Sequence, residues 1–205
     1  MNKGIFLIFA FFIVTNVFLG CRTNSTGPSE SQPNASELSS MEKAVVSSDN
    51  SFGFKLFAKI NESQQNNNVF ISPFSVSMAF GMLLNGANGA TLDSLEQTLG
   101  DAGMSLNDIN NAYENSSAFL TALDAHVIFQ NANSIWYRNG FQVLPAFLSV
   151  NKTYFDADVD ALDFSLPTAA QTINNWVDTK TNGKIPTVIT PPIPPEAVMY
   201  LINAI

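Results

Sequence analysis

The run AVMYLINAI, residues 197–205, constrains the fold of this chain more than any other segment. It is uncharged and almost entirely apolar, and the amide Asn203 interrupts it. A short apolar run that follows the proline-rich segment TPPIPPE is typical of a strand buried on both faces of a sheet. We therefore expect covering elements on both faces. We also expect a hydrogen-bonding partner for Asn203, because a buried unpaired amide costs about 1–3 kcal/mol.

The composition is that of one folded domain with an acidic surface. Of 205 residues, 46% are hydrophobic and only 13% are charged, which is too apolar for a disordered chain. The formal net charge is −8. This charge argues against nucleic acid as a partner, because phosphate binding requires clustered lysines and arginines.

The N-terminus has the pattern of a secretory signal over residues 1–20. Lys3 precedes the short apolar run GIFLIFAFFIV, and Gly20 stands before Cys21, the single cysteine of the chain. This end resembles the lipobox of bacterial lipoproteins, in which the thiol is acylated, although Phe18 stands where leucine is usual. We therefore predict a lipid on Cys21 that anchors the protein outside the cytoplasm. An ordinary cleaved signal and an uncleaved anchor are the alternatives.

Residues 21–40 are predicted to be a flexible tether between this signal and the folded part. They are rich in serine, asparagine, proline and threonine and contain almost nothing to bury. Such a composition does not compensate for the entropy lost on ordering. The folded part is therefore expected to begin near residue 41.

A buried helix is predicted near the start of the folded part. Ser72 is a good N-cap and Pro73 suits the first helical position, where its missing N–H costs nothing. The following residues, FSVSMAFGMLL, are apolar around most of the helix circumference, which predicts burial on nearly all sides. An amphipathic helix over 52–60 and a short strand, VFIS, at 69–72 are predicted before it.

Helices and strands are also predicted along the rest of the chain. Thr91 is the expected cap of a helix over 92–99, and Ser105 opens another through Phe119. The apolar and aromatic run that begins at His126 predicts a strand ending at Asn139-Gly140. The remaining predictions are a helix over 142–155, a strand over 159–164, and a helix opened by a capping box of Thr168 and Gln171 and stopped by Gly183.

The residues that most often carry enzymatic chemistry do not form a recognisable site. The one histidine, His126, has no second histidine or cysteine at zinc-ligand spacing, and the chain lacks a Gly-x-Ser-x-Gly motif. The acidic group of Asp156, Asp158, Asp160 and Asp163 lacks the glycine and terminal glutamate of an EF-hand loop. Trp136 and Trp176 are interpreted as core residues. We therefore predict no enzyme, no metal site and no cofactor.

Four segments together resemble the serpins, the serine protease inhibitor family. They are NVFISPFSVSMAFGMLLNGANGAT, ANSIWY, INNWVDTKTNGKI and LINAI; they stand in the family's order, and the resemblance covers essentially all of residues 43–205. The resemblance implies an α+β serpin fold of which residues 41–205 are the N-terminal half. This half comprises a helical cluster packed on part of sheet A, with one strand of sheet B. The resemblance ends before the reactive centre loop, so the reactive site is absent from this chain.

The resemblance implies a function that the missing C-terminal half must complete. Serpins inhibit serine proteases, and some cysteine proteases, as suicide substrates whose cleaved loop inserts into sheet A. Ser72 and Ser75 in SPFS, and Asn203 in LINAI, match the shutter where that sheet parts. A monomer is expected for the full-length protein. The alternative is a non-inhibitory serpin-fold protein that binds a partner or serves a structural role at the cell surface.

Overall fold

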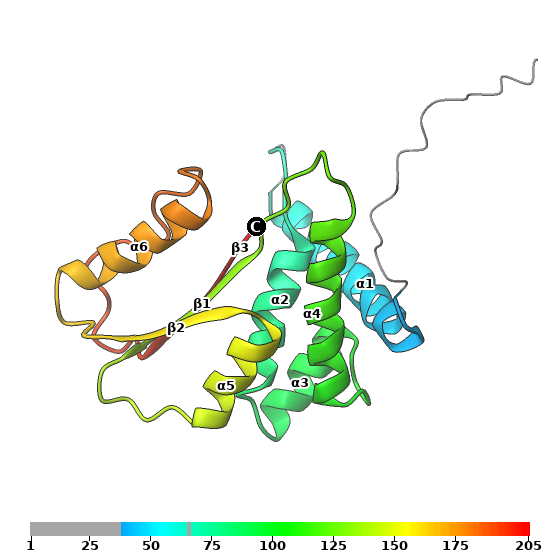
Figure 1. The fold of residues 1–205 in the computed structure, drawn as a ribbon, viewed down its shortest axis with the longest axis horizontal. Coiled ribbons are helices and arrows are strands. Elements are labelled where there is room, and N and C mark those ends of the chain that lie inside the picture. Colours follow the sequence, from blue (N-terminus) through cyan, green and yellow to red (C-terminus); the bar gives the residue numbers. More distant parts are fainter. Residues whose placement is uncertain (1–37, 65–66) are drawn as a thin grey trace, which may run out of the picture. The chain divides into compact units, whose positions relative to one another are not determined.

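The computed structural model describes residues 38–64 and 67–205, which form a three-stranded sheet with helices on both faces (Figure 1). The strand order is β2-β1-β3, with β1 (Ala132–Arg138) in the centre. β2 (Ala157–Leu162) runs parallel to β1, and β3 (Met199–Ala204) runs antiparallel to it. The helical cluster on a partial sheet agrees with the α+β fold predicted from the sequence.

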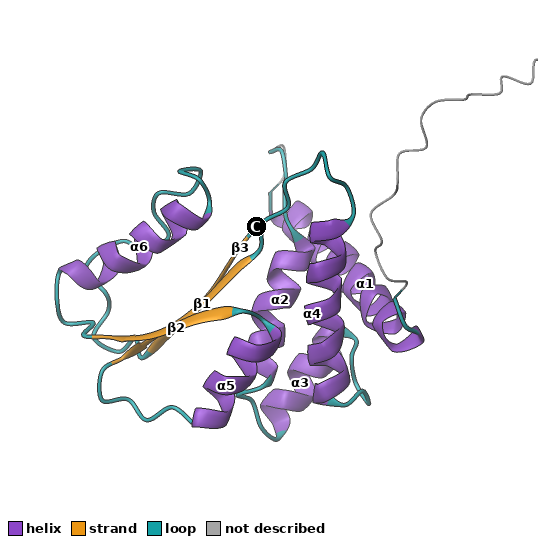
Figure 2. Cartoon of the chain, in the orientation of Figure 1, coloured by secondary structure: helices purple, strands orange, loops and turns teal. Residues whose placement is uncertain are grey.

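Two of the first four helices begin at the caps that the sequence predicts. The four are α1 (Ser40–Ser63), α2 (Pro73–Leu84), α3 (Ala90–Leu99) and α4 (Leu106–Ala122) (Figure 2). Ser72 caps α2 and Ser105 caps α4, each accepting a bond from the backbone N–H three residues on. α1 begins well before the predicted helix over 52–60, because Ser39 and Glu42 form a capping box. α3 begins at Ala90 with Gly89 at its N-cap and without a side-chain cap, so Thr91 is not the cap.

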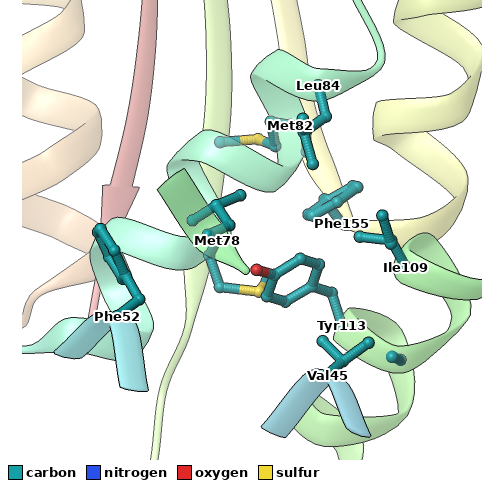
Figure 3. Packing of buried hydrophobic residues seen from close by; sticks show 11 residues of the cluster. Val45, Phe52, Met78, Met82, Leu84, Ile109, Tyr113 and Phe155 are labelled. Atoms are coloured by element: carbon teal, nitrogen blue, oxygen red, sulfur yellow. The ribbon is translucent and has the colours of Figure 1, made fainter. Parts of the chain in front are cut away.

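Helix α2 occupies the centre of the larger of two hydrophobic cores (Figure 3). Met78, Met82 and Leu84 are almost completely buried, as the uniformly apolar sequence of this helix predicts. They pack among side chains of α1, α3 and α4, and Phe155 closes the cluster next to the sheet. α2 is therefore fixed on several sides, including the side that meets β3.

The second core lies between the other face of the sheet and α6 (Thr168–Lys180). Trp136 of β1 and Ile173 of α6 are buried there. Alternate residues of β3 serve the two cores: Leu201 packs with the α2 core, whereas Tyr200 and Ile202 pack with the α6 core. The C-terminal run is thus covered on both faces, as expected, and α5 (Pro145–Tyr154) links the parallel strands β1 and β2.

Several predicted boundaries are wrong. Residues 69–72 form no strand, because no strand among the described residues lies beside them, and Phe70 is 98% exposed. His126 does not begin a strand: it lies in an exposed turn, and β1 starts six residues later, at Ala132. Pro167, and not Thr168, is the N-cap of α6, because its fixed φ already suits the first turn.

The C-terminal strand is less enclosed than a strand in the middle of a sheet. β3 pairs with β1 on one edge, and no described residue pairs with its other edge. Its residues 199–203 are accordingly half-buried, and Ala204 is buried. Among the described residues, no helix combines the length and apolarity needed to cross a membrane.

Candidate functional site

The predicted shutter residues Ser75 and Asn203 meet between α2 and β3. Asn203 lies opposite Asn133 of β1 in the antiparallel register, on the same face of the strand as Leu201. That face packs against α2, whose first turn holds Ser75. The Ser75 hydroxyl donates a hydrogen bond to Oδ1 of Asn203.

The amide nitrogen of Asn203 is fully used on the sheet side. Nδ2 donates to Oδ1 of Asn131 over 2.6 Å and to Oδ1 of Asn133 over 2.7 Å. Both ends of this amide are therefore hydrogen-bonded, which confirms the expectation that Asn203 has a partner. The side chain ties β3 to α2 on one side and to β1 on the other.

The hydrogen bonds continue beyond Asn203 into two further elements. Asn133, which is only 2% exposed, donates from Nδ2 to the backbone carbonyl of Phe155 over 2.6 Å. Asn131 donates to the hydroxyl of Ser117 in α4 over 3.2 Å. We call the linked side chains the amide cluster: Ser75, Ser117, Asn131, Asn133 and Asn203.

Ser72 does not join this cluster directly. Its hydroxyl caps α2 by accepting a hydrogen bond from the backbone N–H of Ser75 over 3.4 Å. Among the described residues no hydrogen bond joins Ser72 to Asn203. Ser72 thus orients the turn that carries Ser75, whereas Ser75 makes the contact with the strand. The predicted lipidation residue, Cys21, lies outside the described residues.

Sequence reasoning missed Asn131 and Asn133. Both stand in the segment QNANSIWY, two positions apart, and two residues with this spacing share one face of an extended chain. Polar residues on the inward face of an otherwise apolar strand are a signal of a buried polar network, because each must find a partner. That signal was available, but it did not indicate which residue they would meet.

A groove of about 340 Å³ runs beside the amide cluster, between α2 and β3. Its lining consists of polar and apolar side chains: Ser75, Val76, Ala79, Phe80, Leu201, Ile202 and Asn203. None of these described lining residues is a carboxylate, a histidine or a lysine, so none is a general base beside Ser75. The Ser75 hydroxyl serves here as a hydrogen-bond donor to Asn203.

The other candidate residues form no hydrogen bond to the amide cluster among the described residues, although Asp156 borders a pocket that Asn131 and Asn133 also line. Asp158 accepts a hydrogen bond from Trp176 Nε1 over 2.8 Å and forms an ion pair with Lys180 over 3.1 Å. The hydrogen bond from Trp176, with a further contribution from Lys180, lowers the pKa of the Asp158 carboxyl. Asp163 bonds to Ser165 instead. No group of three or more potential metal ligands is found in the part of the chain that the structure describes.

The two tryptophans connect α6 to the sheet. Trp136 is buried and meets the ring of Trp176 edge-on, with 6.2 Å between centroids. Together with the bonds of Asp158, this contact holds α6 over β1 and β2. Their interpretation as packing residues agrees with this geometry.

A second polar cluster is buried between α1, α3 and α4. The Tyr113 hydroxyl donates to the carboxylate of Asp49 over 3.0 Å. Asp101 is completely buried, and neither of its carboxylate oxygens has a hydrogen-bond partner among the described residues. Burial raises the pKa of Asp101 to about 6, with a further contribution from the negative charge of Asp49.

These features define a class: an α+β fold in which a helical cluster meets one face of a mixed sheet, with a hydroxyl and an amide joined where the cluster meets β3. Comparison with known proteins identifies the family. The family model for Serpin (serine protease inhibitor) matches residues 47–205, and the chain therefore belongs to the serpin family.

Individual relatives agree with this assignment. The leukocyte elastase inhibitor of Xenopus laevis is 36% identical over 159 residues, which are 75% of this chain and 41% of that protein. Iripin-1 of Ixodes ricinus is 36% identical over 160 residues, which are 76% of this chain and 41% of that protein. The chain thus spans less than half the length of these curated relatives.

Solved structures show the same partial coverage. The thermophilic serpin Tengpin in its latent state superposes with a TM-score of 0.68 at 33% identity, over 82% of this chain and 44% of that one. Cleaved Serpin 42Da gives a TM-score of 0.71 at 26% identity, over 80% and 43% of the two chains. The serpin fold predicted from the sequence is confirmed.

Proposed function

We propose that this chain supplies the N-terminal half of an inhibitor that traps serine proteases as a suicide substrate. Membership of the serpin family supports protease inhibition, and the relative from Xenopus laevis is named an inhibitor of an elastase. The reactive loop of a serpin lies in the half that this chain does not contain. Inhibition therefore requires the C-terminal half, and cysteine proteases are a further class of target.

The observation that carries the proposal is the match of the serpin family model to residues 47–205, together with the amide cluster that ties β3 to α2 and β1. Loop insertion needs a sheet that can part and accept a new strand through backbone hydrogen bonds. The described strand β3 pairs with β1 on one edge, and the strand beside its other edge is expected from the C-terminal half. Ser75 and Asn203 hold this strand through small side chains, which leave the groove of about 340 Å³ beside them unfilled.

The second candidate function is a non-inhibitory binding protein. It is favoured by the likeness to reactive-loop-cleaved human thyroxine-binding globulin, which has a TM-score of 0.72 at 27% identity and covers 80% of this chain and 49% of that one. That protein is named for binding a ligand. The two functions differ in whether the loop inserts fast enough to trap the acylated protease.

Gel electrophoresis under denaturing conditions distinguishes the two. The complete polypeptide that begins with this chain is incubated with trypsin, chymotrypsin or elastase, and the products are separated after boiling in detergent. An inhibitor gives a band at the summed mass of the protein and the protease, because the acyl ester survives. A clean cleavage product without such a band, for every protease tested, would support the binding protein.

We further propose that the protein is anchored to a membrane, facing outside the cytoplasm. The sequence pattern around Gly20 and Cys21 supports this, since a basic start and a short apolar run precede them. In this account residues 1–20 are removed, Cys21 is acylated and residues 21–40 tether the serpin domain. An inhibitor in this position meets proteases at the cell surface.

A further inference from the structure

A cavity of about 540 Å³ is lined by residues at the beginning of α6 and by the proline-rich connector that leads to β3. It is separate from the amide cluster. Its lining is mainly apolar and consists of Phe164, Leu166, Ala170, Ile193 and prolines of the connector. Its volume falls in the range of about 300–1,000 Å³ typical of small-molecule sites.

Arg138, at the end of β1, is the one charged residue among the described residues that line the cavity. Its guanidinium is held in place by backbone carbonyls of the connector: Nε and Nη2 donate to Ala197, and Nη2 also donates to Pro195 over 2.9 Å. The guanidinium lies 5.2 Å from the ring centroid of Phe164. Nε and Nη2 are already engaged by the carbonyls, and Nη1 has no hydrogen-bond partner among the described residues. A fixed cation of this kind is suited to orienting a carboxylate through Nη1, because the side chain needs no reordering.

The beginning of α6 adds to the positive potential of the cavity. Pro167, its N-cap, makes no side-chain hydrogen bond to the first turn, and both Pro167 and Ala170 line the cavity. Helix N-termini carry partial positive charge and favour anions. Two carboxylates stand near the lining in the sequence, and both are exposed. Asp163 bonds to Ser165 and interacts with the charge of Arg138, and Glu196 follows Pro195. Neither lines the cavity, whose lining is apolar apart from Arg138 and Ser165.

We propose that this cavity binds a small organic monocarboxylate with an aromatic or branched apolar body. The apolar lining takes the body, and Arg138 with the first turn of α6 takes the carboxylate. Neutral ligands of the same shape bind more weakly, because they leave the cation without its charge partner. A bound acid also contacts the proline-rich connector that leads into β3, and it therefore restricts the motion of this connector.

Isothermal titration calorimetry with two matched probes tests the proposal. Phenylbutyrate carries the carboxylate, whereas phenylbutanol has a closely similar apolar body without charge. The purified full-length protein is expected to bind phenylbutyrate at least about tenfold more tightly, which is about 1.4 kcal/mol. Equal affinity for the two probes, or no saturable binding of phenylbutyrate by protein with a native circular dichroism spectrum, would overturn the proposal.

A pair of charge variants locates the site. Leu166 lines the cavity and is 53% exposed, so Leu166→Asp places a negative charge there without disturbing a buried position. Leu144→Asp makes the same change at a leucine that is 75% exposed and lies outside this cavity. We expect Leu166→Asp to weaken phenylbutyrate binding by about tenfold or more and Leu144→Asp to leave it unchanged. If the two variants bind phenylbutyrate with equal affinity, the ligand binds outside this cavity and the proposal is contradicted.

Discussion

The Ser75 hydroxyl donates a hydrogen bond to the side-chain oxygen of Asn203, 128 positions along the chain. This bond joins the first turn of α2 to the penultimate residue of β3. Because Nδ2 of Asn203 bonds to Asn131 and Asn133, the same amide also connects β3 to its neighbouring strand. One side chain therefore couples the helical core, the central strand and the strand whose outer edge is free of described partners.

Replacement of Asn133 by alanine is predicted to be the most costly single change in the amide cluster. It leaves the carbonyl of Phe155 without its bond and removes one acceptor from Asn203, in a site only 2% exposed. We expect a loss of about 2–4 kcal/mol in the free energy of unfolding, measured by urea denaturation. Asn111→Ala, at an exposed bond within α4, is the control and is expected to change it by less than about 0.5 kcal/mol.

Gly81→Ala tests the tight packing of α2 against α4. A Cβ at this position would lie 2.8 Å from a ring carbon of Tyr113 and 3.0 Å from one of Phe155. Alanine is a better helix former than glycine, so helix propensity alone predicts that the free energy of unfolding rises by about 1 kcal/mol. We expect the opposite result, because the added methyl group overpacks the core and lowers the free energy of unfolding by about 1–3 kcal/mol. A more stable variant in thermal denaturation would show that the two rings can move aside.

The buried carboxyl of Asp101 is predicted to make stability depend on pH. Burial raises its pKa to about 6 in the folded protein, above its ordinary value of 3.8, so the folded state holds this proton more tightly than the unfolded state. The protonated Asp101 carboxyl therefore adds to the free energy of unfolding. This stabilisation is complete below about pH 4 and is lost as the pH rises through about 6.

Asp101→Asn isolates this contribution because it keeps the shape and removes the titration. Relative to the parent, the variant is expected to gain about 1–2 kcal/mol between pH 4 and pH 7, after allowance for screening of the charge. Urea denaturation at several pH values measures the difference. A difference between the two proteins that stays constant over this range would mean that Asp101 is ionised in the folded state throughout.

Cys21→Ser is predicted to release the protein from membranes, because the lipid that we propose on Cys21 provides the anchor. Detergent phase partitioning of cell fractions compares the parent and the variant. The parent is expected in the detergent phase and the variant in the aqueous phase. Partitioning of both proteins into the detergent phase would mean that the apolar run of residues 1–20, and not a lipid, holds the protein.

Features that depend on neighbouring residues could be predicted from the sequence, and those that depend on distant ones could not. Ser72 and Ser105 were recognised as N-caps because a cap bonds to an amide three residues away. The start of β1 was placed too early, because residues 126–131 have strand-like composition but no strand beside them. At α6, the capping-box pattern of Thr168 and Gln171 was misleading, since Pro167 itself fits the N-cap.

At the candidate site too, features set by neighbouring residues could be predicted and features set by distant residues could not. The need of Asn203 for a partner followed from its place in an apolar run, and the family resemblance placed it with Ser72 and Ser75 at the shutter, whereas the bond to Ser75 itself comes from the structure. Asn131 and Asn133 were missed, because the pairing of β1 with β3 brings together residues 70 and more positions apart. The register that creates this contact is set by two strands and by the helices packed on them, so no single segment encodes it.

A double-mutant cycle on Ser75 and Asn203 tests the central claim most directly. Ser75→Ala, Asn203→Ala and the double variant are compared with the parent by urea denaturation. If the hydroxyl and the amide hold β3 on α2, the two changes are not additive, and the coupling free energy is about 1 kcal/mol or more. Additive changes, with a coupling within about 0.3 kcal/mol of zero, would contradict the account.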